Sequence, residues 1–492
     1  MQKFFGREDE LKKLKQLSQK DSASLVVIKG RRRIGKSRLA IEFGKEMKKV
    51  VTFSGMPPSQ HLSAQEERDD FAHQMSRMLN IPPFKTEDWG DLLYYLAQAT
   101  QRGQILIVLD EINWIGSKDS TFLGKLKTAW DQFFSKNPRL IMILCGSLSG
   151  WIEKNILTST GFVGRISKTF TLRELPLCEC NLFWQKHRHY ISAYEKFKFL
   201  AVSGGIPKYL EEMLPIKTAE QNIFNLCFQS EGFLFREFDQ LFHDLFSKKS
   251  AKYKLILKAL SEGKKDLEKI YQSLNLKKTG YIVSEYMNDL EQGGFIQRDF
   301  TWNLKSRRKS KLSTYRLSDN YARFYLKYIE PRAEKIKQGT ISKIPSYESI
   351  LGLQFENLVL NNRLALYNLL EIDPGLIIND NPYFQNKTKH QAGCAIDYLI
   401  QTEQEVFYLF EIKFSRKKVT SQIIQEVKEK VKKLSLNQSA SVRPILLHVN
   451  GVNDAVAKSG YFNHIIDFSN LLLKRPFNRE VRQIDELKTG QR

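Results

Sequence analysis

The segment GRRRIGKS at residues 30–37 has the residue types and spacing of a phosphate-binding loop. It follows a predicted apolar strand, SLVVIKG (24–30), and opens a predicted helix, which is the context that the motif requires. Glycines let the backbone turn its N–H groups toward phosphates, and the helix N-terminus favours an anion. The residues expected to bind nucleotide here are Gly30, Arg31, Arg32, Arg33, Ile34, Gly35, Lys36, Ser37 and Arg38.

A second apolar strand, ILIVLD (105–110), and Glu111 directly after it supply the acids that this loop needs. Lys36 is expected to reach the β- and γ-phosphates, and Ser37 and Asp110 to hold Mg²⁺. Glu111 is placed to polarise the attacking water. The sequence therefore predicts an ATP and Mg²⁺ site.

A third chemical pattern lies near the C-terminus, in the apolar strand VFYLFEIKF (406–414). Side chains two apart in a strand share a face, so Glu411 and Lys413 point the same way. The preceding strand, CAIDYLIQT (394–402), brings Asp397 opposite Glu411, and Glu356 lies on an upstream helix. Two carboxylates and a main-chain carbonyl can hold Mg²⁺ or Mn²⁺ against a phosphate, while the lysine acts on water. The alternative is a charged edge strand.

The segment KSRRKSK (305–311) carries five positive charges in seven residues. Three predicted helices precede it and strands flank it, which is the pattern of a winged helix-turn-helix. We expect DNA phosphates to be contacted here; the alternative is a solvated hairpin tip. The residues in this expectation are Lys277, Lys278, Arg307, Arg308 and Lys309.

The elements that position these residues divide the chain into four parts. Apolar strands alternating with helices predict a P-loop ATPase core with a parallel sheet over 1–172. A helical lid is expected over 173–248 and the winged helix over 249–335. A polar linker follows, and the order α-β-β-β-α-β is expected over 346–475.

The motifs FGREDEL (5–11), GRRRIGKS, ILIVLDE, ILCGS (143–147), GRI (164–166) and GGIPKYL (204–210) occur in the order seen in an archaeal and bacterial P-loop ATPase family. The first 215 residues or so resemble this AAA+/STAND-like family. The resemblance implies sensor 1 at Ser147, an arginine finger at Arg165 that completes a neighbour's site in a homo-oligomer, and sensor 2 at Lys208. Many relatives have arginine at the last position.

The C-terminal set Asp397, Glu411 and Lys413, with Glu356, resembles the PD-(D/E)xK nuclease superfamily, whose element order also agrees. The ATPase family often carries such a domain. The expected fold is therefore α/β: an AAA+-like parallel-sheet ATPase with a helical lid, a winged helix-turn-helix and a restriction-endonuclease-like C-terminal domain.

The composition of the chain limits the classes of binding partner and the location that we expect. The chain has 492 residues and a formal net charge of +23, which favours nucleic acid over acidic small molecules. The five cysteines form no CxxC pair, so reduced, structural thiols are expected. The N-terminus has no apolar core and the apolar runs are short, so we expect no signal peptide, no membrane partner and a cytoplasmic location.

Three functions fit these observations. The first is an ATP-driven DNA-processing or defence protein in which nucleotide controls a nuclease. The second is a STAND-type signalling ATPase whose C-terminal domain binds a partner and is catalytically inactive. The third is a DNA-binding regulator that acts through the winged helix.

Overall fold

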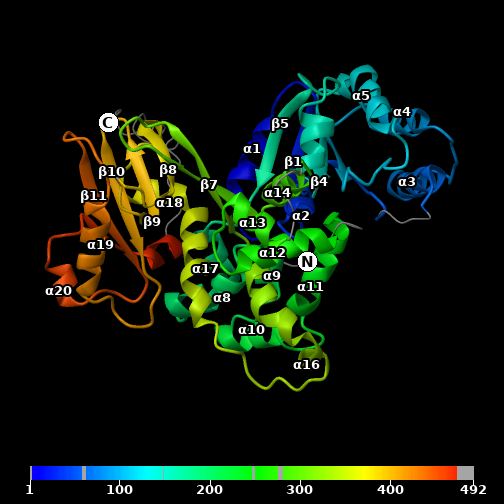
Figure 1. Ribbon diagram of the computed structural model, residues 1–492. Helices are drawn as coiled ribbons and strands as arrows, with labels where there is room; N and C mark the ends of the chain where they lie inside the picture. Colours follow the sequence, from blue (N-terminus) through cyan, green and yellow to red (C-terminus); the bar gives the residue numbers. More distant parts are fainter. Residues whose placement is uncertain are drawn as a thin grey trace, which may run out of the picture.

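The computed structural model of the protein describes residues 3–57, 62–147, 149–246, 250–274, 281–389 and 391–473. It is an α/β protein with two five-stranded sheets and a two-stranded hairpin. Figure 1 shows the two larger sheets on opposite sides of the molecule, with the helices of the middle of the chain between them. Within the described ranges, no helix is long and apolar enough to cross a membrane.

The N-terminal sheet is parallel throughout and has the order β2-β3-β4-β1-β5. Its strands are β1 (Ser24–Gly30), β2 (Lys49–Ser54), β3 (Ile105–Asp110), β4 (Leu140–Gly146) and β5 (Ile166–Leu172). Because all strands run the same way, Gly30, Asp110 and Gly146 end at one edge of the sheet. The predicted parallel-sheet core is confirmed, with β5 as an additional edge strand.

Helices cover both faces of this sheet, which explains why its central strands are continuously apolar. One face packs against α1 (Glu8–Ser18) and α2 (Lys36–Gly44). The other packs against α3 (Ala64–Leu79), α4 (Trp89–Ala99) and α5 (Phe122–Gln132). Alternate residues of one strand serve the two faces: Val26 and Ile28 lie in one apolar cluster, and Leu25 and Val27 in the other.

The middle of the chain is helical. After the short α6 (Ser149–Ile152), its first helices are α7 (Leu177–Cys180), α8 (Ala193–Ser203), α9 (Pro207–Glu211), α10 (Ala219–Cys227) and α11 (Phe233–Phe246). Then come α12 (Ser250–Ser261), α13 (Leu267–Ser273), α14 (Tyr281–Gln292), and the antiparallel strands β6 (Ile296–Trp302) and β7 (Lys309–Leu317). Three helices and a hairpin occur in the predicted order, and the winged-helix interpretation remains a prediction. The expected polar linker contains the short helix α16 (Ala333–Lys337).

The C-terminal sheet is mixed and has the order β12-β11-β10-β9-β8. Its elements are α17 (Glu348–Asn361), α18 (Arg363–Leu369), β8 (Ile377–Gln385), β9 (Cys394–Thr402), β10 (Val406–Ile412), α19 (Gln422–Lys432), β11 (Ser441–His448), α20 (Asp454–Ala457) and β12 (His464–Asp467). Strands β8, β9 and β10 are antiparallel neighbours, while β10, β11 and β12 are parallel.

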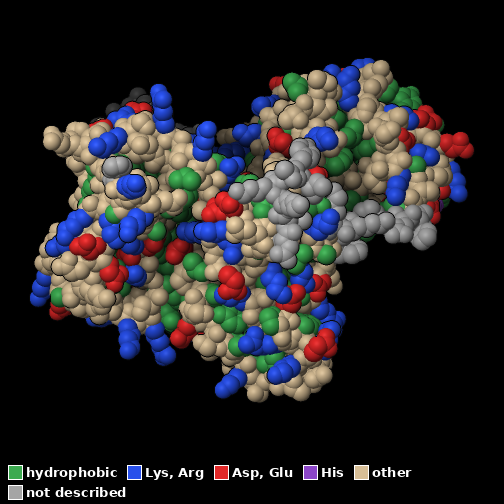
Figure 2. All heavy atoms as spheres, viewed as in Figure 1, with side chains coloured by type: hydrophobic (Ala, Val, Ile, Leu, Met, Phe, Trp, Pro, Cys, Tyr) green, Lys and Arg blue, Asp and Glu red, His purple; other side chains and the backbone are tan. Residues whose placement is uncertain are grey.

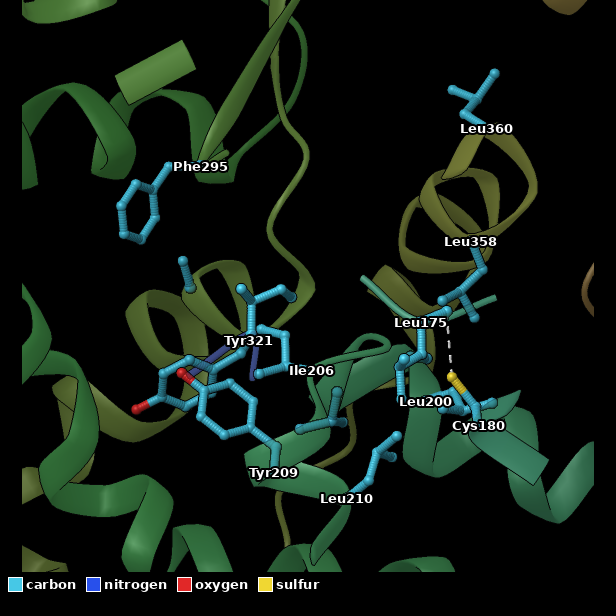
Figure 3. Close-up of a cluster of buried hydrophobic side chains, with 14 of the residues drawn as sticks. Leu175, Cys180, Leu200, Ile206, Tyr209, Leu210, Phe295, Tyr321, Leu358 and Leu360 are labelled. Atoms are coloured by element: carbon cyan, nitrogen blue, oxygen red, sulfur yellow. Dashed lines mark hydrogen bonds between the residues drawn. The ribbon is translucent and has the colours of Figure 1, made fainter. Parts of the chain in front are cut away.

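One apolar core runs through the parts of the chain without a break. It includes Ile28 of β1, Tyr209 of α9, Phe355 of α17 and Phe410 of β10. Figure 3 shows part of it: Ile206 and Tyr209 lie beside Tyr321 of α15 (Asn320–Phe324), and Leu358 of α17 lies near Leu175. Such a shared core holds the two large sheets in one body.

The basic hairpin does not project freely into solvent, which differs from the expected wing. Trp302 is 4% exposed, and its indole Nε1 donates to Gln401 Oε1 at 2.7 Å. Its ring lies 5.3 Å from that of Tyr383, and Leu304 belongs to the same apolar cluster. Aromatic side chains of this size bury a large apolar area, so the hairpin base packs firmly against the C-terminal sheet.

We predict that Trp302→Ala destabilises the protein by about 3–5 kcal/mol, because it leaves a large cavity and removes the donor to Gln401 Oε1. Urea unfolding followed by circular dichroism measures the loss. Leu312→Ala on the same hairpin is the control, since Leu312 is 46% exposed. Equal, small effects of both substitutions would contradict the docked hairpin.

Candidate functional site

The turn between β1 and α2 has the backbone shape that the phosphate-loop prediction requires. Gly35 has φ 91°, and Arg33 has φ 70°, which is uncommon for a residue with a side chain. A Cβ on Gly30 would lie 2.4 Å from the Leu172 carbonyl oxygen, so β5 leaves no room for a side chain there. Helix α2 begins at Lys36, directly after this turn.

Lys36 is buried at the centre of the loop. Its Nζ donates to the carbonyl oxygens of Gly30 and Arg31, both at 3.1 Å, and to Ser147 Oγ at 2.9 Å. Burial lowers the pKa of Lys36, and the nearby Glu111 opposes this effect. The ammonium group thus donates only to neutral oxygens, and a phosphate oxygen, which is charged, would be a stronger acceptor for it.

Ser37 and Asp110 come together at the end of β3. The Ser37 hydroxyl hydrogen-bonds to Asp110, which lowers the pKa of that carboxyl, while burial raises it and gives a net upward shift. A hydroxyl and a carboxylate are the hard oxygen ligands that Mg²⁺ accepts beside nucleotide phosphates. These two residues therefore fit the expected magnesium ion, whose other ligands would be phosphate oxygens and water. Within the described ranges, no group of three or more His, Cys, Asp or Glu side chains is placed to hold a metal ion by itself.

Glu111 is held by Ser147, the residue at the end of β4. Ser147 Oγ donates to Glu111 Oε1 at 2.7 Å, and the Ser147 backbone N–H donates to Oε2 at 3.2 Å. Glu111 itself has φ 50°, a strained conformation of the kind that concentrates at functional sites. Lys36, Ser147 and Glu111 thus form one chain of hydrogen bonds beside the loop.

The loop arginines point away from the space that the loop encloses. Arg31 pairs with Asp319 and donates to the Tyr209 hydroxyl at 3.3 Å. Arg33 forms a two-pronged pair with Glu237, at 2.9 and 3.1 Å. The guanidinium group of Arg32 lies over the Trp114 ring. Nucleotide contact by Arg31, Arg32, Arg33, Ile34 and Arg38 accordingly remains a prediction about their backbone N–H groups.

Lys208, the residue at the sensor 2 position, lies on α9 next to the loop: a Cβ on Gly35 would be 3.9 Å from Pro207 Cγ. Its Nζ is 2.5 Å from Glu212 Oε1, and it lies over the Phe233 ring. Lys208 is therefore near the predicted site but bound to an acid of its own helix.

Arg165 lies at the opposite end of the sheet from the loop. It precedes β5, whose Ile166 pairs with Leu25, whereas Leu172 pairs with Gly30. The intervening strand length is roughly 20 Å at about 3.3 Å per residue, so Arg165 cannot reach the loop of its own chain. Its guanidinium binds Asp131 of α5 at 2.6 and 2.8 Å, and this lowers the pKa of Asp131 to about 2.

The C-terminal residues that were predicted to form a site also lie close together. Phe410 pairs with Tyr398, so Asp397 and Glu411 are next in register on adjacent strands. Glu411 is buried, and Lys413 Nζ lies 3.0 Å from its Oε1. Burial, followed by the charges of Glu411 and Glu356, raises the pKa of Asp397 to about 6. Glu356 itself pairs with Lys264 at 3.7 Å.

Lys430 of α19, which sequence analysis missed, occupies this cluster. Its Nζ lies 2.5 Å from Glu411 Oε2 and 4.0 Å from Asp397 Oδ1. Burial lowers the pKa of Lys430, but Asp397 and Glu411 outweigh that effect and raise it. Asp397 Oδ2 also accepts the Ile412 N–H at 2.9 Å. With ammonium groups on both Glu411 oxygens, the cluster as arranged does not fit a divalent metal.

The predicted DNA contacts divide into three groups. Lys277 and Lys278 lie outside the described residues. Arg307 donates to the Glu403 carbonyl at 3.2 Å and approaches Glu405, so it contacts the C-terminal sheet. Arg308 and Lys309 are exposed. On the face that Figure 2 shows, Lys and Arg side chains are spread over the whole molecule rather than gathered at one place.

Sequence reasoning also missed Tyr209, Glu237 and Asp319, the partners of the loop arginines. The one available signal was the run of three arginines in GRRRIGKS, because an arginine that becomes buried needs acceptors and often pairs with an acid. Nothing in the local sequence indicates which acids these are.

Residues 4–213 match the model of a family described as an ATPase domain found predominantly in Archaea. Together with the parallel sheet and the loop geometry, this match supports a P-loop ATPase fold for the N-terminal part of the chain.

Individual relatives are distant. An uncharacterized protein of Methanocaldococcus jannaschii is 26% identical over 362 residues, which is 72% of this chain and 75% of that protein. A Walker-type ATPase of Pyrococcus abyssi is 18% identical and covers 66% of this chain and 96% of its own, with a TM-score of 0.45. The Aeropyrum pernix ORC2 protein is 16% identical and covers 68% and 94%, with a TM-score of 0.41.

Proposed function

We propose that this protein binds and hydrolyses ATP with Mg²⁺, and that nucleotide state controls a C-terminal domain that acts on DNA. The observation that carries the ATPase proposal is the hydrogen-bonded chain of Lys36, Ser147 and Glu111 beside Ser37 and Asp110. In this proposal Lys36 and the loop N–H groups hold the phosphates. Glu111 orients the attacking water, and Ser147 positions Glu111. Mg²⁺, when bound, offsets charge on the phosphate oxygens.

We predict that Lys36→Ala weakens ATP binding by about 10- to 100-fold, because a charge-assisted hydrogen bond contributes about 1.5–3 kcal/mol. Glu111→Gln should keep ATP affinity and lower kcat by about 100-fold or more, as loss of a positioned base does. Titration calorimetry measures binding, and phosphate release measures turnover.

Lys29→Ala is the matched control, since Lys29 lies one residue before the loop and pairs with Glu153 instead. It should leave ATP affinity unchanged. Wild-type protein without measurable ATP affinity would overturn the proposed function.

We also propose that Arg165 acts on the ATP site of a second copy of the chain. Its distance from its own loop and its partly exposed side chain support this role, and in-trans arginines raise rates strongly where they operate. For this role the Arg165 guanidinium would have to leave Asp131.

Mixing Arg165→Ala protein with Glu111→Gln protein should then restore part of the ATPase activity that neither has alone. Specific activity that stays constant on dilution into the monomeric range would contradict assembly.

A second candidate function is cleavage of DNA by the C-terminal domain. The convergence of Asp397, Glu411 and Lys413 at one end of paired strands favours it. Because Lys430 holds Glu411, we derive no metal-dependent step from this arrangement. The competing interpretation is a binding module that cuts nothing, controlled by the same ATPase domain.

Incubation of plasmid and single-stranded DNA with the protein, with and without ATP and with Mg²⁺ or Mn²⁺, separates these two. If the site cleaves, Asp397→Asn and Lys413→Ala should abolish cleavage, because each removes a group that faces the phosphate. Lys432→Ala is the control, since Lys432 is exposed on α19 and pairs with Glu429. DNA left intact by the wild type under every condition favours the binding module.

A further inference from the structure

Two buried acids outside the ATPase-family segment hold the phosphate loop. Asp319 pairs with Arg31, and the two side chains are 0% and 7% exposed. Glu237 pairs with Arg33, and the two are 1% and 31% exposed. Residues 4–213 match the family, so both acids come from later parts of the chain.

Tyr209 joins the two pairs. Its hydroxyl accepts a hydrogen bond from Arg31 at 3.3 Å and lies 3.4 Å from Glu237 Oε1, to which it donates. The guanidinium of Arg31 also lies 5.0 Å from the centre of the Phe295 ring. Figure 3 shows Tyr209 between the backbone of α9 and Tyr321, below Phe295. Both sides of the loop are therefore fixed by one network.

Asp319 is itself fixed to the C-terminal part of the chain. It caps α15 by accepting the Ala322 N–H at 2.8 Å. The next residue, Asn320, donates to the Gln354 carbonyl at 3.0 Å and accepts from Gln354 Nε2 at 2.7 Å. Gln354 belongs to α17, the helix that packs under the C-terminal sheet. A displacement of α17 would thus move the partner of Arg31.

The two arginine–acid pairs fix the backbone of the loop, which includes a carbonyl oxygen that binds Lys36. The Arg31 carbonyl accepts from Lys36 Nζ, and Arg33 keeps its left-handed φ while its side chain is clamped by Glu237. A buried charge that loses its partner is not compensated by solvent, so the loop would have to rearrange if either acid were neutralised. If these ion pairs served stability alone, breaking one of them would lower the free energy of unfolding without changing the affinity of the loop for ATP.

We propose that Asp319 and Glu237 are positioning residues of the nucleotide site, so that ATP affinity depends on how the C-terminal half of the chain docks. This inference rests on the proposed ATP binding. The inference goes beyond ATP binding because it places part of the nucleotide site outside the segment that matches the ATPase family, and because it links that site to α17.

The test compares Asp319→Asn with Asp119→Asn in the full chain. Asp119 is the control: it pairs with the largely buried Arg68 of α3 at 3.5 Å, and it accepts further hydrogen bonds from Thr121, so this pair lies outside the network that joins the loop to α17. We expect Asp319→Asn to raise the Kd for ATP by about 10-fold, as loss of one charge-assisted hydrogen bond does, and Asp119→Asn to leave it within about twofold. KM should rise while kcat is retained, because Glu111 and Ser147 are untouched.

A second measurement separates positioning from folding. Arg31→Gln combined with Asp319→Asn should change the Kd no more than Asp319→Asn alone, because both act through one pair. Hydrogen exchange in α15 and α17 should slow on ATP addition in the wild type and not in Asp319→Asn. Should Asp319→Asn fail to fold, Tyr209→Phe, which removes a single hydroxyl, replaces it with the same expected direction.

Equal ATP affinity in Asp319→Asn and Asp119→Asn, or tighter binding in Asp319→Asn, would overturn the inference while leaving the proposed ATPase intact. Absence of ATP binding by the wild type would instead overturn both, and Lys36→Ala identifies that case.

Discussion

The arrangement of this molecule depends on how three consecutive arginines in a phosphate loop are satisfied. An arginine keeps its charge in a protein interior, so a buried one needs oxygen acceptors, and a carboxylate also balances its charge. Arg31 and Arg33 pair with carboxylates at the N-cap of α15 and on α11, 288 and 204 residues further along the chain. Those pairings require the later helices to lie against the loop, and the continuous apolar core is the packing that results.

Sequence patterns predicted the elements that are locally determined. The strands at 24–30 and 105–110 have the expected bounds because each is a continuous apolar run that ends in a glycine or an acid. Strand β5 was not expected, because ISKTFTL is half exposed at the sheet edge and lacks such a run. The single helix predicted upstream of the C-terminal strands is divided into α17 and α18 near Asn362. The Asn362 side chain donates to the Leu358 carbonyl at the end of α17 and accepts the Leu177 N–H.

Site residues show the same division between local and distant causes. Lys36, Ser37, Asp110 and Glu111 could be named because the motif and strand ends bring them together. Lys430 could not, since only the packing of α19 on the sheet places its ammonium group on Glu411. The basic segment 305–311 has a charge pattern typical of a solvated or DNA-binding tip. Trp302 ends β6 and Leu304 begins the turn just before this segment. Both are buried against the C-terminal sheet, so the base of the hairpin is not solvated.

The shared core has a consequence for synthesis of the chain. Tyr209 leaves the ribosome well before Tyr321 and Leu358, which are buried in the same cluster. At about 5–20 residues per second, the ~150 residues between Tyr209 and Leu358 take roughly 7–30 s to appear. During that interval the N-terminal sheet can form, but the apolar surface of α8 and α9 lacks its partners on α15 and α17. An incomplete chain therefore exposes apolar surface that the finished protein buries, and such surface promotes aggregation.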